Sequence, residues 1–256
     1  KETKRKPSAP FITSTLQRAA SSKLGFGVQK TMQVAQKLYE GIEIDGTPVG
    51  LITYMRTDSV RVSDDARDMA HDFILQNYGE NYYPKDANVY AKGKQNVQDA
   101  HEAIRPSYPE RTPDSIKKYL DNDQYKLYKL IWEKFMSSQM APAEIANKSI
   151  EITSGDYMLR AGTSKVVFDG FLTLYNDAEE GEEGSSDAKI PDLEKGDKVV
   201  CKKINPKQHF TQPPPRYNEA SLVKALEEYG IGRPSTYATI ITVIQTRKYV
   251  EKKDKA

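Results

Sequence analysis

The sequence contains little cysteine, little histidine and no long hydrophobic run. Its 256 residues include one cysteine, Cys201, and three histidines. A single cysteine excludes an internal disulfide and a multi-cysteine zinc site, and it is compatible with a reducing cytoplasm. No stretch approaches the roughly 18 uncharged apolar residues that a membrane-spanning helix needs, so we expect no contact with a membrane.

The sequence also has no large excess of either charge. Lys and Arg number 38, Asp and Glu number 36, and the net charge is +2. Six of the acidic residues lie in segment 177–187, DAEEGEEGSSD, which we expect to be exposed or disordered. The rest of the chain carries 38 basic against 30 acidic residues. A mildly basic surface suits a polyanionic partner, although many other soluble proteins share it.

The apolar pattern predicts an α+β, multidomain fold. Spacings of three and four residues predict helices over 14–25, 27–41, 64–79, 112–120 and 123–140, with Ser63 and Thr112 as N-caps. Alternation around DGTP predicts a β-hairpin over 41–55. Short antiparallel strands are predicted over 148–155, 156–162, 165–175 and 197–204, followed by helices over 218–230 and 233–246 and a short strand. The predicted domains are a helical one (9–139), a β-rich segment (140–212) and a C-terminal part (213–256).

The stretch GLITYMRTDS, residues 50–59, holds the first candidate site. If the second strand of the hairpin continues, Tyr54 and Arg56 share one face, and the guanidinium reaches either the phenol or a phosphate. A phenol attacks well only when its proton leaves or its developing charge is neutralised. Thr57 and Asp58 then break the alternation, as a functional turn would. The alternative is a plain strand end with a surface arginine.

Two further segments offer phosphate donors. In QDAHEAIRPS, residues 98–107, His101 and Arg105 are spaced to lie side by side on a helical turn, or they belong to a capped surface turn. No second histidine stands near enough for a zinc helix. In the C-terminal helix pair, Arg233, Ser235 and Thr236 stand at a helix entrance after Gly232, where they contact a phosphate or only support packing.

Taken together, these segments resemble a known enzyme family. PFITSTLQRAAS, LITYMRTDS, AHEAIRPS, HFTQPPPRYNEASLVKALEEYGIGRPSTYATII and RKYV occur in this order from about Pro10 to Val250. They resemble the central part of bacterial DNA topoisomerase I, in the type IA topoisomerase family. The resemblance implies that Tyr54 attacks one DNA strand and holds its 5′-phosphate as a transient phosphotyrosine. It also implies that Arg56 positions the scissile phosphate and that His101 assists DNA binding and cleavage.

The resemblance carries further expectations about partners and cofactors. We expect Thr57, Asp58, Arg105, Arg233, Ser235 and Thr236 to contact DNA. The family's toprim domain, which binds Mg²⁺, and its zinc ribbons have no match here, so we expect no metal site within the chain. The expected partners are single-stranded or negatively supercoiled DNA and the toprim domain of the same polypeptide, in the cytoplasm at the bacterial nucleoid.

Three alternatives for the function follow. In the first, the chain is the tyrosine-bearing part of a topoisomerase that relaxes negative supercoils without ATP, and these 256 residues alone do not relax DNA. In the second, it is a non-catalytic nucleic-acid-binding module in which Tyr54 stacks on a base. In the third, it binds another protein through the hairpin or the acidic segment. Salt-dependent DNA binding separates the third from the first two.

Overall fold

The structure is a computed structural model that describes residues 1–90, 101–176, 190–191 and 193–253. It contains helices and two antiparallel sheets, so the predicted α+β class is confirmed. The acidic segment 177–187 lies outside the described residues. The helices are α1 (Thr13–Leu24), α2 (Val28–Glu40), α3 (Asp64–Asn77), α4 (Asn122–Gln139), α5 (Glu219–Glu228) and α6 (Tyr237–Thr246). The strands are β1 (Glu2–Arg5), β2 (Ile42–Ile44), β3 (Thr47–Val49), β4 (Ala143–Ser154) and β5 (Tyr157–Phe168).

Local signals in the sequence explain where the long helices begin and end. The Ser63 side chain accepts a hydrogen bond from the amide of Ala66 and caps α3, as predicted. Asp121 and Gln124 form a capping box at the start of α4. α1 ends at Gly25, whose φ of 67° is a left-handed conformation that suits glycine. Among the described residues no helix is long and apolar enough to cross a membrane.

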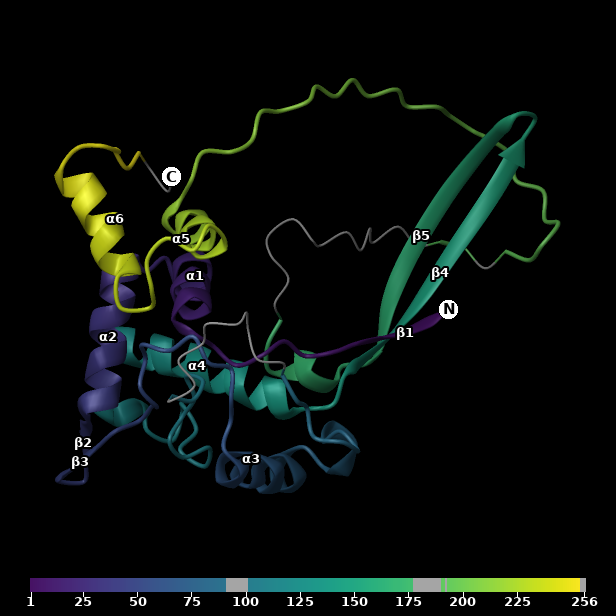
Figure 1. Ribbon diagram of the computed structural model, residues 1–256. Coiled ribbons are helices and arrows are strands. Elements are labelled where there is room, and N and C mark those ends of the chain that lie inside the picture. Colours follow the sequence, from purple (N-terminus) through teal and green to yellow (C-terminus); the bar gives the residue numbers. More distant parts are fainter. Residues whose placement is uncertain (91–100, 177–189, 192, 254–256) are drawn as a thin grey trace.

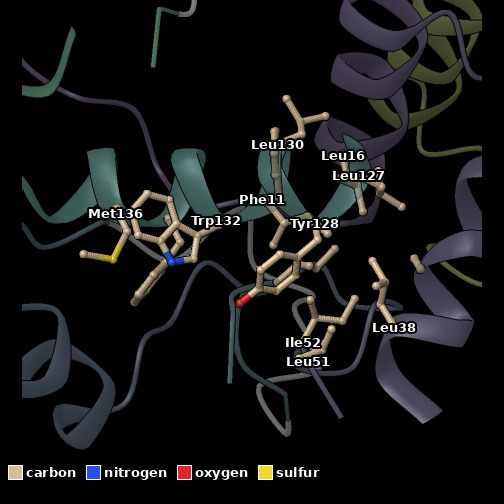
Figure 2. Packing of buried hydrophobic residues seen from close by; sticks show 14 of the residues in the cluster. Phe11, Leu16, Leu38, Leu51, Ile52, Leu127, Tyr128, Leu130, Trp132 and Met136 are labelled. Carbon is tan, nitrogen blue, oxygen red and sulfur yellow. The ribbon is translucent and has the colours of Figure 1, made fainter. Parts of the chain in front are cut away.

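The main core surrounds α4, which crosses the middle of the helical part (Figure 1). Its side chains pack against α1, α2 and the residues that follow β3, as Figure 2 shows for Tyr128 beside Leu38, Leu51 and Ile52. The two large polar aromatics of this helix bury their rings and satisfy their polar atoms. Tyr128 donates to the carbonyl of Arg111 (2.7 Å), and the Trp132 indole donates to that of Pro109 (2.9 Å). Burial raises the pKa of Tyr128.

The predicted series of short strands is wrong in number and length. β4 and β5 form one long antiparallel hairpin that projects away from the helices (Figure 1). Its turn falls between Ser154 and Tyr157, and β1, which the sequence pattern did not predict, pairs with the inner half of β4. Gly162 does not end a strand, because it pairs with Ser149 in the middle of the ladder. Residues 170–173 form a short 3-10 helix, η3 (Gly170–Thr173), and residues 197–204 form no strand.

Two predictions for short elements, the helix over 112–120 and the strand after the last helix, are also wrong. Residues 112–120 form turns and a short 3-10 helix, η2 (Lys117–Tyr119), in place of an α-helix. The Thr112 hydroxyl does accept from the Ser115 amide (3.3 Å), but the chain becomes extended at Leu120 and the capping box of α4 begins at Asp121. A second 3-10 helix, η1 (Glu80–Tyr82), follows α3, and residues 247–250 form turns where a strand was predicted.

The C-terminal helix pair is confirmed and lies against the first two helices (Figure 1). A second, smaller apolar cluster joins α2, α5 and α6 and consists of Val28, Val223, Leu226, Tyr237 and Ile241. Two polar contacts support it: the Ser14 hydroxyl donates to Glu227 (2.8 Å), and Glu219 accepts from the Val28 amide (2.7 Å). The pair therefore meets the helical part beside the segment that carries Tyr54.

Candidate active site

Tyr54 lies in an irregular segment after the β2–β3 hairpin. β3 ends at Val49, so the prediction that a strand of this hairpin delivers Tyr54 is wrong. After Val49 the chain no longer pairs with β2, because its backbone takes new hydrogen-bond partners. The Leu51 amide donates to Leu38 (2.8 Å), the Ser107 amide donates to Leu51 (2.9 Å), and Ile52 forms a bridge with Pro106. Segment 50–59 therefore runs beside segment 101–107.

The residue before Tyr54 fastens these two segments together. The Thr53 hydroxyl donates to the carbonyl of Ala103 (2.7 Å) and accepts from the amide of Arg105 (3.0 Å). The Thr53 amide donates to the carbonyl of Arg105 (3.0 Å). Segment 101–107 consequently forms no helical turn, and the prediction of a helical turn at His101 is wrong. Its backbone forms bridges to other segments and cannot also form local helical bonds.

Rings enclose the half-buried phenol of Tyr54 on two sides. The Tyr54 and His101 centroids lie 5.1 Å apart, with the ring planes inclined by 49°. Tyr39 meets the Tyr54 ring edge to face, with centroids 5.4 Å apart. The sequence indicated the first partner through its motif, but it gave no sign of Tyr39 beyond its place near the end of a helix.

A cavity of about 510 Å³ opens beside Tyr54. It lies between two parts of the chain that are far apart in sequence: the segment after β3 together with His101, and the turn that links α5 to α6. Its lining residues are Tyr54, Arg56, Thr57, Asp58, His101, Arg233, Pro234 and Ser235. The structure thus brings together seven of the nine predicted site residues, and Pro234 is the lining residue that the prediction omitted.

The cavity has two cationic side chains, of which Arg233 donates to the carbonyl of Gly232 (2.7 Å). Arg56 and Arg233 are exposed, and Asp58 is the one carboxylate in the described lining. Within the described part of the chain, neither the Tyr54 hydroxyl nor the Arg56 guanidinium takes part in a hydrogen bond or an ion pair. Both groups are therefore available to an anionic ligand.

Two predicted contact residues lie outside this cavity. Arg105 is only 12% exposed and pairs with Glu102 at 2.8 Å, and it also donates to the carbonyl of Pro106. The Thr236 hydroxyl accepts from the amide of Arg233 (2.8 Å) and donates to its carbonyl (3.1 Å). These side chains are already bonded within the protein, so we expect them to support the site without touching DNA.

The turn between α5 and α6 depends on a glycine. Gly232 has a φ of 80°, and a Cβ at this position would lie 2.8 Å from the Ile240 side chain. Behind the turn, Tyr237 is buried, and burial is the main cause that raises the pKa of its phenol; Glu227 adds to the shift and Arg233 opposes it. Arg233 is therefore fixed at the cavity by a turn that tolerates little substitution.

The described residues do not fit a metal centre. Among them, no group of three or more His, Cys, Asp or Glu side chains could hold a metal ion. What the site offers chemically is a phenol, two guanidinium groups and an imidazole around a solvent-filled space. This combination suits attack of the phenol on a phosphodiester whose charge the arginines neutralise.

Comparison with known proteins shows the family of the chain. The sequence model of the family described as DNA topoisomerase matches residues 1–256. The chain belongs to the DNA topoisomerase family. It is 50% identical to DNA topoisomerase 1 of Xylella fastidiosa over 98% of its own length, which corresponds to 31% of that protein. It is also similar to the structure of full-length topoisomerase I from Thermotoga maritima, with a TM-score of 0.82 and 38% identity over 100% of this chain and 40% of that one. The chain thus spans well under half the length of both relatives.

Proposed function

We propose that this chain contributes the nucleophile of a type IA topoisomerase reaction. In this proposal Tyr54 cleaves one DNA strand and forms a transient 5′-phosphotyrosine. The observation that carries the proposal is the position of the Tyr54 phenol at a cavity lined by Arg56, His101 and Arg233. Membership of the DNA topoisomerase family supports the same substrate.

The proposed step exchanges one phosphodiester for another. The phenol oxygen of Tyr54 bonds to the scissile phosphorus, the bond from phosphorus to the 3′ oxygen of the upstream nucleotide breaks, and that oxygen takes up a proton as the phenol loses one. The number of phosphodiester bonds does not change, so resealing needs no ATP. The reverse attack by the 3′ hydroxyl releases Tyr54, for which a phenolate is an adequate leaving group.

The side chains around the cavity have separate roles in this proposal. Arg56, next to the nucleophile, neutralises the scissile phosphate, and its planar guanidinium suits two oxygens at once. Arg233 and Ser235 approach from the other wall and bind the DNA backbone. His101, against the ring of Tyr54, limits the directions in which the phenol can point and offers a further donor.

The proposed reaction involves magnesium only at a site outside this chain. The resemblance implies a Mg²⁺ ion held by a toprim domain, and no described residue cluster here fits such an ion. We therefore propose that any metal is bound elsewhere and that the 256 residues alone bind DNA without relaxing it. Efficient relaxation of supercoiled DNA by the pure chain with Mg²⁺ would contradict this part of the proposal.

The decisive experiment needs a complete enzyme around Tyr54. A chimera is made in which the chain replaces the matching 31% of the Xylella protein. It is incubated with a 3′-labelled single-stranded oligonucleotide and Mg²⁺ and quenched with detergent, and the label on the protein is measured. We expect label with Tyr54, none with Tyr54→Phe, and retained label with the control Tyr39→Phe, whose ring is 5.4 Å away.

Two other results of the labelling experiment would change the proposal. Label that persists in Tyr54→Phe and disappears in Tyr39→Phe shows that Tyr39 is the nucleophile. A chimera that binds the oligonucleotide but never takes up label, while the intact Xylella enzyme does, supports a binding module in which Tyr54 stacks on a base.

A further inference from the structure

No contact of the Arg56 side chain within the described residues fixes the direction in which its guanidinium points. It is exposed and, within the described residues, has no hydrogen-bond or ion-pair partner. It lines the cavity beside His101 and also a second cavity of about 910 Å³ that runs along α2 towards Asp123. The backbone sets the direction of the Cα–Cβ bond and restricts the first rotamer, and it is the main constraint on a side chain that no other group holds. The backbone on each side of Arg56 therefore determines the direction in which this side chain leaves the main chain.

One buried hydroxyl, that of Thr13, holds that backbone on both sides. Thr13 stands at the start of α1 and is 0% exposed. Its hydroxyl donates to the carbonyl of Met55 at 2.8 Å, which belongs to the peptide unit before Arg56. The same oxygen accepts from the amide of Thr57 at 2.9 Å, which belongs to the peptide unit after Arg56.

These two bonds constrain the two soft dihedral angles of Arg56 together. The peptide planes on either side of its Cα are both tied to one oxygen atom, so φ and ψ cannot rotate without breaking a buried hydrogen bond. A second link makes the attachment rigid, since the Thr13 amide donates to the carbonyl of Thr57 at 2.9 Å. The Thr13 hydroxyl also lies 3.0 Å from the Thr57 carbonyl, so its single hydrogen is shared between that carbonyl and the nearer one of Met55.

We propose that Thr13 is a positioning residue for Arg56. Through the two peptide units it sets the direction in which the guanidinium enters the cavity beside Tyr54. This inference rests on the proposed function, in which Arg56 contacts a DNA phosphate. It assigns a role to the Thr13 hydroxyl in PFITSTLQ, which bonds to backbone groups on both sides of Arg56 and which valine would lack.

The test uses the chain itself and its binding to a fluorescent single-stranded oligonucleotide. The affinity is measured by anisotropy over a range of salt concentrations, because each phosphate contact adds about 0.7 to the slope of log affinity against log salt. The variants are Thr13→Val, Thr13→Ser and Arg56→Ala, and the double variant of Thr13→Val with Arg56→Ala. The control is Thr31→Val, another fully buried threonine, whose hydroxyl donates to the carbonyl of Gly27, the residue before α2.

We expect Arg56→Ala and Thr13→Val each to reduce the salt slope by about 0.7 and the affinity by about tenfold. Thr13→Ser keeps the hydroxyl and restores both values, and Thr31→Val changes neither. In the double variant, Thr13→Val has no further effect, because both changes remove the same contact. Thermal unfolding checks that each variant is folded, and Thr13→Ala replaces Thr13→Val if the latter is not.

Three results would overturn the inference, and they are distinguishable. If Arg56→Ala lowers the slope while Thr13→Val behaves like the Thr31→Val control, Arg56 contacts phosphate and Thr13 does not position it. A full additional loss from Thr13→Val in the Arg56→Ala background also shows that Thr13 does not act through Arg56. If Arg56→Ala itself changes nothing, the proposed role of Arg56 fails and the inference fails with it.

Discussion

His101 and Tyr54 are in ring contact, with centroids 5.1 Å apart, although they come from segments far apart in the sequence. The hydroxyl of Thr53 creates this contact by bonding to the backbone of Ala103 and Arg105, which follow His101. The nucleophile proposed here is thus oriented by a neighbour that is itself aligned by the residue just before Tyr54.

The first prediction concerns this contact. His101→Ala should weaken the binding of a single-stranded oligonucleotide by the chain about fivefold, because one donor worth about 1 kcal/mol is lost at the cavity. It should also lower the yield of covalent adduct in the chimera, because the phenol is less constrained. The matched control is His71→Ala: this histidine pairs with Asp72 and packs on Tyr83, away from the cavity. Equal effects of both changes would contradict a specific role for His101.

The second prediction concerns the docking of the C-terminal helices α5 and α6 against α2, beside the cavity. α2 begins after Gly27, which has no side chain to cap it, and Glu219 of α5 accepts from the Val28 amide in its place (2.7 Å). The other oxygen of Glu219 pairs with Lys252 (2.8 Å). Glu219→Ala should therefore destabilise the docking of the helix pair by about 1 kcal/mol, the usual cost of a lost helix cap.

Amide hydrogen exchange tests the role of Glu219 directly. Exchange at Val28 should accelerate in Glu219→Ala and remain nearer to that of the unmodified chain in Glu219→Gln, which retains an acceptor. Glu228→Ala is the control, since Glu228 lies on the same helix and makes only an exposed contact with Lys224 at 4.0 Å. Unchanged exchange at Val28 in Glu219→Ala would show that the cap does not hold the two parts together.

The third prediction concerns the bend that separates Tyr54 from its hairpin. A Cβ on Gly50 would lie 2.9 Å from the carbonyl oxygen of Tyr39, so Gly50→Ala must displace the backbone beside the Tyr54 ring. We expect a loss of about 1–3 kcal/mol of stability and weaker oligonucleotide binding. Gly162→Ala is the control, because its Cβ would meet only the Lys148 carbonyl at an ordinary 3.8 Å. Comparable losses of stability in both variants, measured by denaturant unfolding, would contradict the prediction.

The sequence predicted the helices well because their signals are local. The caps at Ser63 and Asp121 and the left-handed Gly25 lie within a few residues of the helices that they delimit. Strands depend on partners that can be anywhere in the chain. The local pattern therefore predicts a strand end at Gly162, whereas its pairing with Ser149 places it inside one long hairpin.

The candidate site shows the same limit. Tyr54, Arg56 and His101 could be predicted because family motifs contain them, and the cavity does bring them together. Their geometry could not be predicted, because it depends on distant contacts. His101 lies at a bend and not on a helical turn because Ile104 and Pro106, which follow it, bridge Phe11 and Ile52. The prediction placed Arg105 at the DNA, and nothing in the sequence indicated its ion pair with Glu102 within the protein.

The fourth prediction concerns pH and a carboxylate on α4. Burial is the main cause that raises the pKa of Glu133 above its ordinary value of 4.5, and Lys129, at 3.7 Å, only partly opposes it. A raised pKa means that the folded chain holds this proton more tightly than the unfolded chain does. The contribution of Glu133 to stability therefore falls as the pH rises from the ordinary pKa through the raised one.

Glu133→Gln removes this titration and keeps a similar shape. The variant should gain stability relative to the unmodified chain as the pH rises from about 4 through that window, and the difference should then level off. Thermal unfolding at a series of pH values measures it, with Glu43→Gln, at the exposed middle residue of β2, as the control. A difference between Glu133→Gln and the unmodified chain that shrinks with rising pH would mean that Lys129 outweighs burial, because an ion pair lowers the pKa of a carboxyl where burial raises it.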